Sequence, residues 1–158
     1  CERDAAVTDT ISRFGGEALR TIWGLQFLCG GDLVEPKASP TQSCTHPVRD
    51  DMRVYAAAGH MHLLGRKITI VANAGTAKEK TLLDIENWDF DAQGAIPLEK
   101  PVDLNKGDTL TVTCTHDATL RGKLPALKNQ PARYITWGEG TTDEMCLGIL
   151  TVAARSKG

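Results

Sequence analysis

From residue 52 onward, the chain consists of short segments rich in β-branched residues, separated by turn-forming residues. Residues 66–72 end at the turn Asn73-Ala74-Gly75, and residues 109–115 follow the turn Asn105-Lys106-Gly107-Asp108. Strands at this spacing are typical of antiparallel sandwiches, jelly rolls and barrels. These segments predict an all-β domain of one of these antiparallel types for residues 44–158. The other predicted strands are residues 53–58, 80–85, 133–137 and 146–153, with a short edge segment between Pro97 and Pro101.

Residues 1–43 have a different pattern and are predicted to form a partly helical N-terminal extension. Apolar residues recur there at spacings of three and four, as on one face of a helix. They are Val7, Ile11, Phe14, Ala18, Ile22 and Leu25. We expect this face to pack on the domain; docking to a partner subunit or to a membrane surface is the alternative.

The helical pattern has clear interruptions. Gly15-Gly16 can break it in two, and Cys29-Gly30-Gly31-Asp32 ends it. Prolines at three positions, together with Ser, Thr and Asp, predict that residues 35–50 form a loop, tied to the body through Cys44. These prolines are Pro36, Pro40 and Pro47.

Composition limits the classes of partner. The chain has 158 residues, enough for one domain with a core, and a net charge of −2. Its charged residues are scattered without a basic stripe, so we expect no nucleic-acid partner. Its apolar runs are far too short to cross a bilayer.

Five cysteines constrain the compartment. None forms a Cys-x-x-Cys pair, which removes support for a zinc ribbon or a thioredoxin-like site. Two disulfides and one odd cysteine suit an oxidising compartment, so we expect the protein to be secreted, periplasmic or anchored at a membrane surface. Cys1 is the candidate for the odd one, as in a processed lipoprotein with a lipid on this sulfur; a chain that merely starts there is the alternative.

His60-Met61-His62 is the clearest candidate for a metal site. On a strand, two histidines at this spacing project from the same face, and their rings can converge on one ion. A thioether such as that of Met145 would add a soft ligand that favours Cu(I) over hard cations. This residue set suits copper; the alternative for these residues is a surface histidine pair and a methionine in the core.

Four motifs together resemble a known family. They occur in the same order as in the copper type II, ascorbate-dependent monooxygenases, the relatives of peptidylglycine α-hydroxylating monooxygenase and dopamine β-hydroxylase. The resemblance covers roughly residues 44–153 and corresponds to the second domain of that two-domain core. With it, we predict an antiparallel jelly-roll β-sandwich for residues 44–158. The motifs are Gly59-His60-Met61-His62-Leu63-Leu64-Gly65, Trp88-Asp89-Phe90-Asp91, Leu104–Leu110 followed by Cys114, and Gly138–Cys146 with Asp143-Glu144-Met145-Cys146.

The resemblance implies a ligand set and a disulfide. His60 and His62 would be the imidazole ligands of one copper ion per chain, and Met145 would be its thioether ligand. A disulfide from Cys114 to Cys146 would hold the backbone beside this flexible methionine. For Cys44 the family's downstream partner is missing. Its expected partner here is Cys29, with Cys1 as the alternative.

The resemblance also has a gap. The family uses a second copper, held by three histidines of its first domain, to supply an electron. Two of the four histidines here are spent on the methionine site, and the other two, His46 and His116, cannot build a three-histidine site. Turnover would need another electron source: a partner subunit, a second copper domain or external ascorbate.

Three classes of function remain open, and whether the chain is an enzyme is left undecided. The chain can be the oxygen-activating half of a monooxygenase that hydroxylates a C–H bond. It can be a non-catalytic copper protein for storage, delivery or electron transfer. It can also be a structural accessory subunit of a membrane-associated complex.

For four polar residues in or near the motifs we expect structural roles and not metal binding. We expect His116 to be a locally bonded residue at a strand end and His46 to be a solvated loop residue, which could serve as a third imidazole if the loop folds over the site. Asp143 and Glu144 are expected to form a turn; the alternative is a carboxylate that orients a ligand imidazole.

Overall fold

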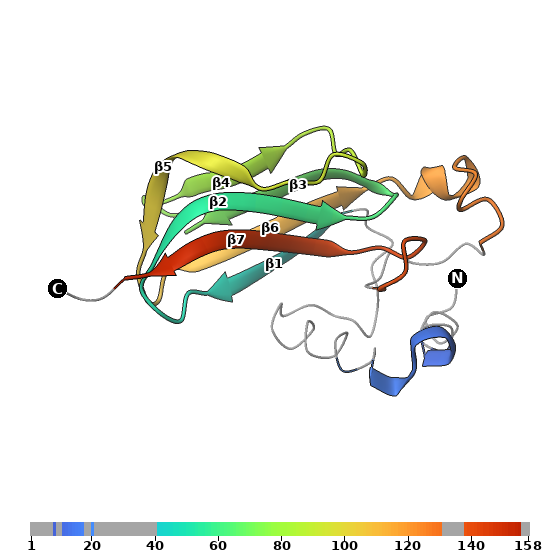
Figure 1. Ribbon diagram of the computed structural model, residues 1–158, viewed down its shortest axis with the longest axis horizontal. Helices are drawn as coiled ribbons and strands as arrows, with labels where there is room; N and C mark the ends of the chain where they lie inside the picture. Colours follow the sequence, from blue (N-terminus) through green and yellow to red (C-terminus); the bar gives the residue numbers. More distant parts are fainter. Residues whose placement is uncertain (1–7, 9–10, 18–19, 21–40, 131–137, 156–158) are drawn as a thin grey trace.

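The computed structural model describes residues 8, 11–17, 20, 41–130 and 138–155. In these residues, seven strands form two antiparallel sheets that pack as a sandwich (Figure 1). Near the N-terminus, residues 11–14 and 16–17 are helical on either side of Gly15. The predicted β-sandwich with a partly helical extension is therefore confirmed. The elements are β1 Thr41–Pro47, β2 Met52–Met61, β3 Gly65–Ala72, β4 Lys80–Ile85, β5 Ile96–Leu104, β6 Thr109–His116, the 3₁₀ helix η1 Ala118–Gly122 and β7 Cys146–Ala154.

The strand order agrees with the predicted jelly-roll type. One sheet has the order β1-β6-β3-β4, and the other has the order β5-β2-β7. Of the described strands, only β3 and β4 are consecutive neighbours in one sheet, whereas every other connection crosses to the opposite sheet. No described helix is long and apolar enough to span a membrane.

The core lies between the two sheets and follows the period-two pattern of the strands. In β3, Ile68, Ile70 and Ala72 are buried, and the residues between them are partly exposed. From the other sheet, Val54 and Met61 of β2 are fully buried against them. Because both ends of β2 are packed in this core, the direction and register of the strand that carries the histidine pair are fixed.

Five of the predicted strands agree with β2, β3, β4, β6 and β7 to within a few residues. The short edge segment between Pro97 and Pro101 lies in β5, which is at the edge of its sheet as expected for a proline-containing strand. Residues 133–137, predicted as a strand, lie outside the described residues.

The prediction of a loop for residues 35–50 is wrong for its second half, because Thr41–Pro47 is the edge strand β1. The prolines misled the prediction: Pro40 precedes the strand and Pro47 ends it, where neither interrupts a ladder in the middle of a sheet. Hydroxyl pairs across the strands stabilise the edge. They are Ser43–Thr113 and Thr45–Thr111 at 2.9 Å and Thr41–Thr115 at 3.5 Å.

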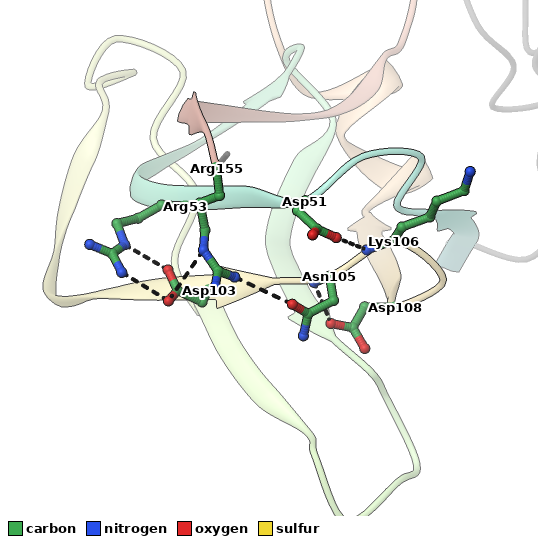
Figure 2. A network of polar contacts seen from close by, with 7 residues as sticks. All are labelled: Asp51, Arg53, Asp103, Asn105, Lys106, Asp108 and Arg155. Atoms are coloured by element: carbon green, nitrogen blue, oxygen red, sulfur yellow. Dashed lines mark hydrogen bonds and ion pairs between the residues drawn. The ribbon is translucent and has the colours of Figure 1, made fainter. Parts of the chain in front are cut away.

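A polar network fastens the end of the sandwich where β2 begins (Figure 2). Arg53 of β2 donates two hydrogen bonds, of 2.6 and 2.9 Å, to Asp103, its register partner on β5. Arg155, which follows β7, lies 3.5 Å from the same carboxylate. Asp51 accepts the backbone N–H of Lys106 at 2.8 Å. The three strands of one sheet, β5, β2 and β7, are thus joined at this end. The histidine pair lies at the opposite end, where β2 finishes.

Candidate metal centre

The pairing of β2 with β7 brings all three predicted ligands to one end of the sandwich. His60 lies in β2 opposite Leu147, and the last residue of β2, Met61, lies opposite Cys146. His62 and Met145 each stand one residue beyond the Met61–Cys146 pair. The backbone of Met145 therefore lies beside the histidine pair, although 83 positions separate it from His62.

A tight turn follows His62, and its geometry requires a glycine. The N–H of Gly65 donates to the carbonyl of His62 at 3.1 Å, and β3 starts at once. A Cβ atom at position 65 would lie 2.8 Å from Met61 Cβ and 2.9 Å from Trp88 Cδ1. The glycine of the His-x-His-x-x-Gly motif thus lets the chain turn back directly after the histidine pair.

His60 is oriented by the loop after β4. Its Nδ1 lies 2.6 Å from Oε1 of Gln93. The amide of Gln93 is itself fixed, because its Nε2 donates to the carbonyl of Phe90 at 2.8 Å and so turns Oε1 toward the ring. Since this oxygen can only accept, Nδ1 of His60 carries the proton, and Nε2 keeps the lone pair for a ligand.

His62 is oriented by the loop before β7. Its Nδ1 lies 3.2 Å from the carbonyl oxygen of Asp143, so this ring also donates through Nδ1 and keeps the lone pair of Nε2. His62 is 5 % exposed, and burial lowers the pKa of its imidazole below the usual value. A lowered pKa keeps the ring neutral, the form in which an imidazole binds a metal.

The two candidate ligand rings lie next to each other. Their centroids lie 5.2 Å apart with the planes at 86°, and each presents its Nε2 as the nitrogen free of these two hydrogen bonds. Metal-binding histidines usually donate the other ring N–H to a carbonyl oxygen or a carboxylate, as both rings do here. In the part of the chain that the structure describes, no three His, Cys, Asp or Glu side chains gather as a metal site. Met145, whose thioether is the predicted third donor, is not among these residue types, and its backbone lies one residue beyond the Met61–Cys146 pair.

A disulfide fixes the strand that follows Met145. Cys114 of β6 and Cys146 of β7 are bonded, with their Cα atoms 5.8 Å apart, as the resemblance implies. Because β6 and β7 belong to different sheets, the bond ties the two layers together at the metal end. Closing a loop of this length stabilises the fold by about 4 kcal/mol in the chain-entropy model. The backbone of Met145 is therefore anchored one residue away.

Cys44 of β1 is also disulfide-bonded. Its candidate partners Cys29 and Cys1 lie outside the described residues, so the pairing of Cys29 with Cys44 stays a prediction.

Behind the candidate ligands lies a buried carboxyl group. Glu144 is 2 % exposed, and its Oε1 accepts the N–H of Leu64, in the turn after His62, at 2.9 Å. Its Oε2 lies 3.7 Å from Nε2 of His116, which is buried at the end of β6. Burial raises the pKa of Glu144 to about 7. Glu144 thus links the loop before β7 to the turn after His62, which goes beyond the simple turn role expected of it.

Asp143 contributes in two ways. Its carbonyl oxygen, rather than its carboxylate, orients His62. Its carboxylate is bound by Arg13 of the N-terminal helical segment, with N–O distances of 2.7 and 3.2 Å. The alternative prediction, an acidic residue that orients a ligand imidazole, is correct about the residue and wrong about the group.

The other two histidines do not join the site. His46 lies in β1, not in a loop, and faces Leu110, six positions along β6 from His116. At about 3.4 Å per residue, this places the backbone of His46 about 20 Å from the metal end. His116 lies close to the site but is buried against Glu144. The structure thus corrects the suggestion that His46 could be a third imidazole.

The exposed surface beside His60 is apolar. In β7, Leu147 and Ile149 alternate outward and are 38 % and 48 % exposed. They lie directly opposite His60 and Ala58. A ligand position on this side of His60 is therefore open to solvent and flanked by aliphatic side chains.

The sequence did not single out Gln93, the partner of His60, or Arg13, the partner of Asp143. Gln93 stands two residues after the Trp88–Asp91 motif, which is the only nearby signal. Arg13 is separated from Asp143 by 130 positions, and nothing in the sequence pattern connects them.

Comparison with known proteins agrees with this geometry. The family model described as copper type II ascorbate-dependent monooxygenase, C-terminal domain, matches residues 34–152, three-quarters of the chain. The match includes the histidine pair, Met145 and both cysteines of the Cys114–Cys146 disulfide. Family and disulfide together indicate an extracytoplasmic protein. The chain belongs to the copper type II ascorbate-dependent monooxygenase family, of which it carries the C-terminal domain.

Proposed function

We propose that His60 and His62, through Nε2, and Met145, through its sulfur, hold one copper ion per chain, and that this domain is the oxygen-activating half of a monooxygenase. The observation that carries the proposal is the matched orientation of the two rings. Each donates Nδ1–H to a carbonyl oxygen and keeps Nε2 for a ligand, at the end where the backbone of Met145 is anchored.

Copper bound there would supply the one-electron chemistry with dioxygen that leads to hydroxylation of a C–H bond. The protein's own residues prepare the site for it. Gln93 and Asp143 fix the two imidazoles, and the buried position of His62 keeps its ring neutral. Two imidazoles and one thioether leave a coordination position open, and the exposed side of His60 gives access to it.

Turnover needs a second electron, and this requirement supports an alternative function. Among the described residues, neither His46 nor His116 is placed to complete a second copper site. The electron would come from a partner subunit, a second copper domain or ascorbate. Without such a donor, the same ligand set would serve a non-catalytic copper protein for storage, delivery or electron transfer, since two imidazoles and a thioether suit Cu(I).

The binding part of the proposal is tested by titrating the protein, with its disulfides intact and oxygen excluded, with Cu(I) in competition with a chromophoric chelator. We expect one equivalent to bind tightly to the wild type and not to His60→Ala. His46→Ala is the matched control, because it removes a histidine far from the site, and its binding should equal that of the wild type. Equal binding by His60→Ala would refute the assignment.

Ascorbate-dependent oxygen consumption by the copper-loaded protein separates the two functions. Consumption that leads to a hydroxylated product in the presence of a candidate substrate, and that disappears in Met145→Leu, is expected of a monooxygenase. Tight binding of Cu(I) without such turnover, with electron donors supplied, would favour the non-catalytic alternative.

A further inference from the structure

The N-terminal helical segment contacts the loop that carries Met145. Arg13 donates from both terminal nitrogens to the two carboxylate oxygens of Asp143, at 2.7 and 3.2 Å. The side chain of Asp143 is 7 % exposed and that of Arg13 is 29 % exposed. A bidentate pair of this kind, whose carboxylate is shielded from water, is stronger and more directional than an ion pair between two exposed side chains.

The loop is closed around the carboxylate that Arg13 binds. Oδ2 of Asp143 accepts the N–H of Gly140 at 3.0 Å, and the N–H of Asp143 donates to the carbonyl of Gly140 at 2.8 Å. A Cβ atom at Gly138 would lie 2.4 Å from Cβ of Asp143, and one at Gly140 would lie 2.8 Å from its Oδ2. The two glycines let the backbone approach the side chain closely, so the position of the carboxylate fixes the course of the loop.

The same residue touches the candidate metal centre through its backbone. The carbonyl of Asp143 accepts the proton of His62 Nδ1 at 3.2 Å, and Met145 follows two residues later. A shift of Asp143 would therefore move the acceptor of one ligand and the backbone of another. Arg13 is a charged group that holds Asp143 from outside the sandwich (Figure 1 shows the N-terminal segment beside the end of the sandwich where β7 begins).

We propose that Arg13 is a positioning residue of the metal centre: by clamping Asp143, the N-terminal segment sets the orientation of His62 and the position of Met145. This inference rests on the proposed copper site. It means that the family domain in this chain is completed by a segment that precedes residue 34, where the family match begins.

The first test is the Cu(I) affinity of Arg13→Met, which keeps the length and the apolar contacts of the stem but removes the guanidinium. Loss of an outer partner of a ligand weakens metal binding by about 10- to 100-fold, and we expect about tenfold because Arg13 acts through Asp143. Arg13→Lys keeps the charge without the bidentate geometry, and its Cu(I) affinity should lie between those of the wild type and Arg13→Met. Arg20→Met is the matched control, because Arg20 forms an exposed pair with Glu17 and its loss should leave the affinity unchanged.

The second test needs no copper. In metal-free protein, long-range ¹H–¹⁵N spectra of the imidazoles report which nitrogen carries the proton. In Arg13→Met, we expect the Nδ1–H form of His62 to lose population to the other tautomer, while His60, held by Gln93, keeps its spectrum. A purely structural role for Arg13 would lower the melting temperature without this selective change.

The outcomes separate the two proposals. Wild-type protein that binds no Cu(I) refutes the proposed function, and the imidazole spectra then decide the role of Arg13 alone. If the wild type binds Cu(I) and Arg13→Met binds it equally well, with an unchanged His62 spectrum, Arg13 has no positioning role. A weaker affinity together with a selective change at His62 supports the proposal.

Discussion

The two histidines occupy different environments although a single residue separates them. His60 is half-buried and bonded to an exposed glutamine, whereas His62 is buried and bonded to a backbone carbonyl. Substitution of Asp143 leaves its backbone carbonyl, the acceptor for His62, in place, whereas substitution of Gln93 removes the side-chain acceptor for His60. The contribution of the outer hydrogen bonds can therefore be measured most cleanly at His60.

Replacing Gln93 by Leu removes the acceptor of His60 Nδ1–H. We expect the Cu(I) affinity to fall by about tenfold or more, because the ring is then free to turn and to change tautomer. The free energy of unfolding should change by less than about 0.5 kcal/mol, since Gln93 lies on the surface. Gln93→Glu keeps an acceptor and should retain most of the affinity, as chelator competition can show. A copper affinity that is the same in Gln93→Leu as in the wild type would mean that Gln93 does not orient His60.

The buried Glu144 makes the stability of the metal-free protein depend on pH. Its folded-state pKa of about 7 lies above the usual value of 4.5, so the folded protein holds this proton at higher pH than the unfolded chain does. The contribution of Glu144 to stability is therefore full below about pH 4.5 and is lost as the pH rises through 7, by about 3 kcal/mol.

Glu144→Gln keeps an oxygen for the Leu64 N–H and removes the ionisation. Urea unfolding of both metal-free proteins between about pH 5 and pH 8 should show a smaller loss of stability with rising pH in the variant. Identical pH profiles would show that burial does not disfavour the charged form of Glu144.

At the scale of single residues, the sequence predicted the ligands better than their supports. His60, His62 and Met145 belong to short motifs, so local spacing was enough to propose them. Gln93 and Arg13 make contacts across 33 and 130 positions, which depend on the packing of loops and leave no periodic pattern. Asp143 was identified, but the use of its carbonyl in place of its carboxylate depends on the backbone direction of the loop.

Among the elements, the β2–β7 pair matters most, because its register alone brings Met145 to the histidines. The sequence predicted both strands from their β-branched residues, whereas their pairing across more than eighty residues required the tertiary fold. The edge strand β1 was missed because its flanking prolines resemble those of a loop. Its Thr and Ser residues at alternate positions were the signal that could have corrected the prediction.

The disulfide between β6 and β7 is expected to stabilise both the fold and the site. The double substitution Cys114→Ser and Cys146→Ser should lower the free energy of unfolding by about 4 kcal/mol. It should also weaken Cu(I) binding, because the backbone beside Met145 loses its covalent anchor. Chemical denaturation and chelator competition measure the two effects.

Wild-type protein with its disulfides reduced is the comparison without a change of sequence; because it also loses the disulfide of Cys44, it should be less stable than the double variant. A variant as stable as the oxidised wild type would show that the bond contributes nothing at this end of the sandwich.

The two ends of the sandwich differ in role: one holds a stabilising polar network, and the other holds the candidate metal centre. The end where β2 begins is closed by the network around Arg53 and Asp103, and the end where β2 finishes carries the candidate metal centre (Figures 1 and 2). The pKa of Asp103 is lowered, mainly by its hydrogen bond from Arg53. The contribution of this pair is therefore present above the unfolded-state pKa of Asp103 and is lost as the pH falls through its lowered folded-state pKa.

Substitution at the network end should leave the metal end unchanged. We expect Arg53→Met to lower the free energy of unfolding slightly near neutral pH, with no change in Cu(I) affinity, because exposed ion pairs contribute little and the site is distant. Combined with Gln93→Leu, its effect should be additive, as for residues without shared partners. Urea unfolding and chelator competition on the single and double variants test this. A Cu(I) affinity that depends on Arg53 would contradict the separation of the two ends.

The central claim is that copper is bound by two imidazoles and the thioether of Met145. It is tested most directly by copper analysis and X-ray absorption on the ascorbate-reduced protein, with Met145→Leu measured beside it. We predict one copper per chain, with nitrogen ligands and one sulfur ligand in the wild type, and loss of the sulfur in the variant. A shell without sulfur in the wild type, or a sulfur that persists in Met145→Leu, would contradict the assignment.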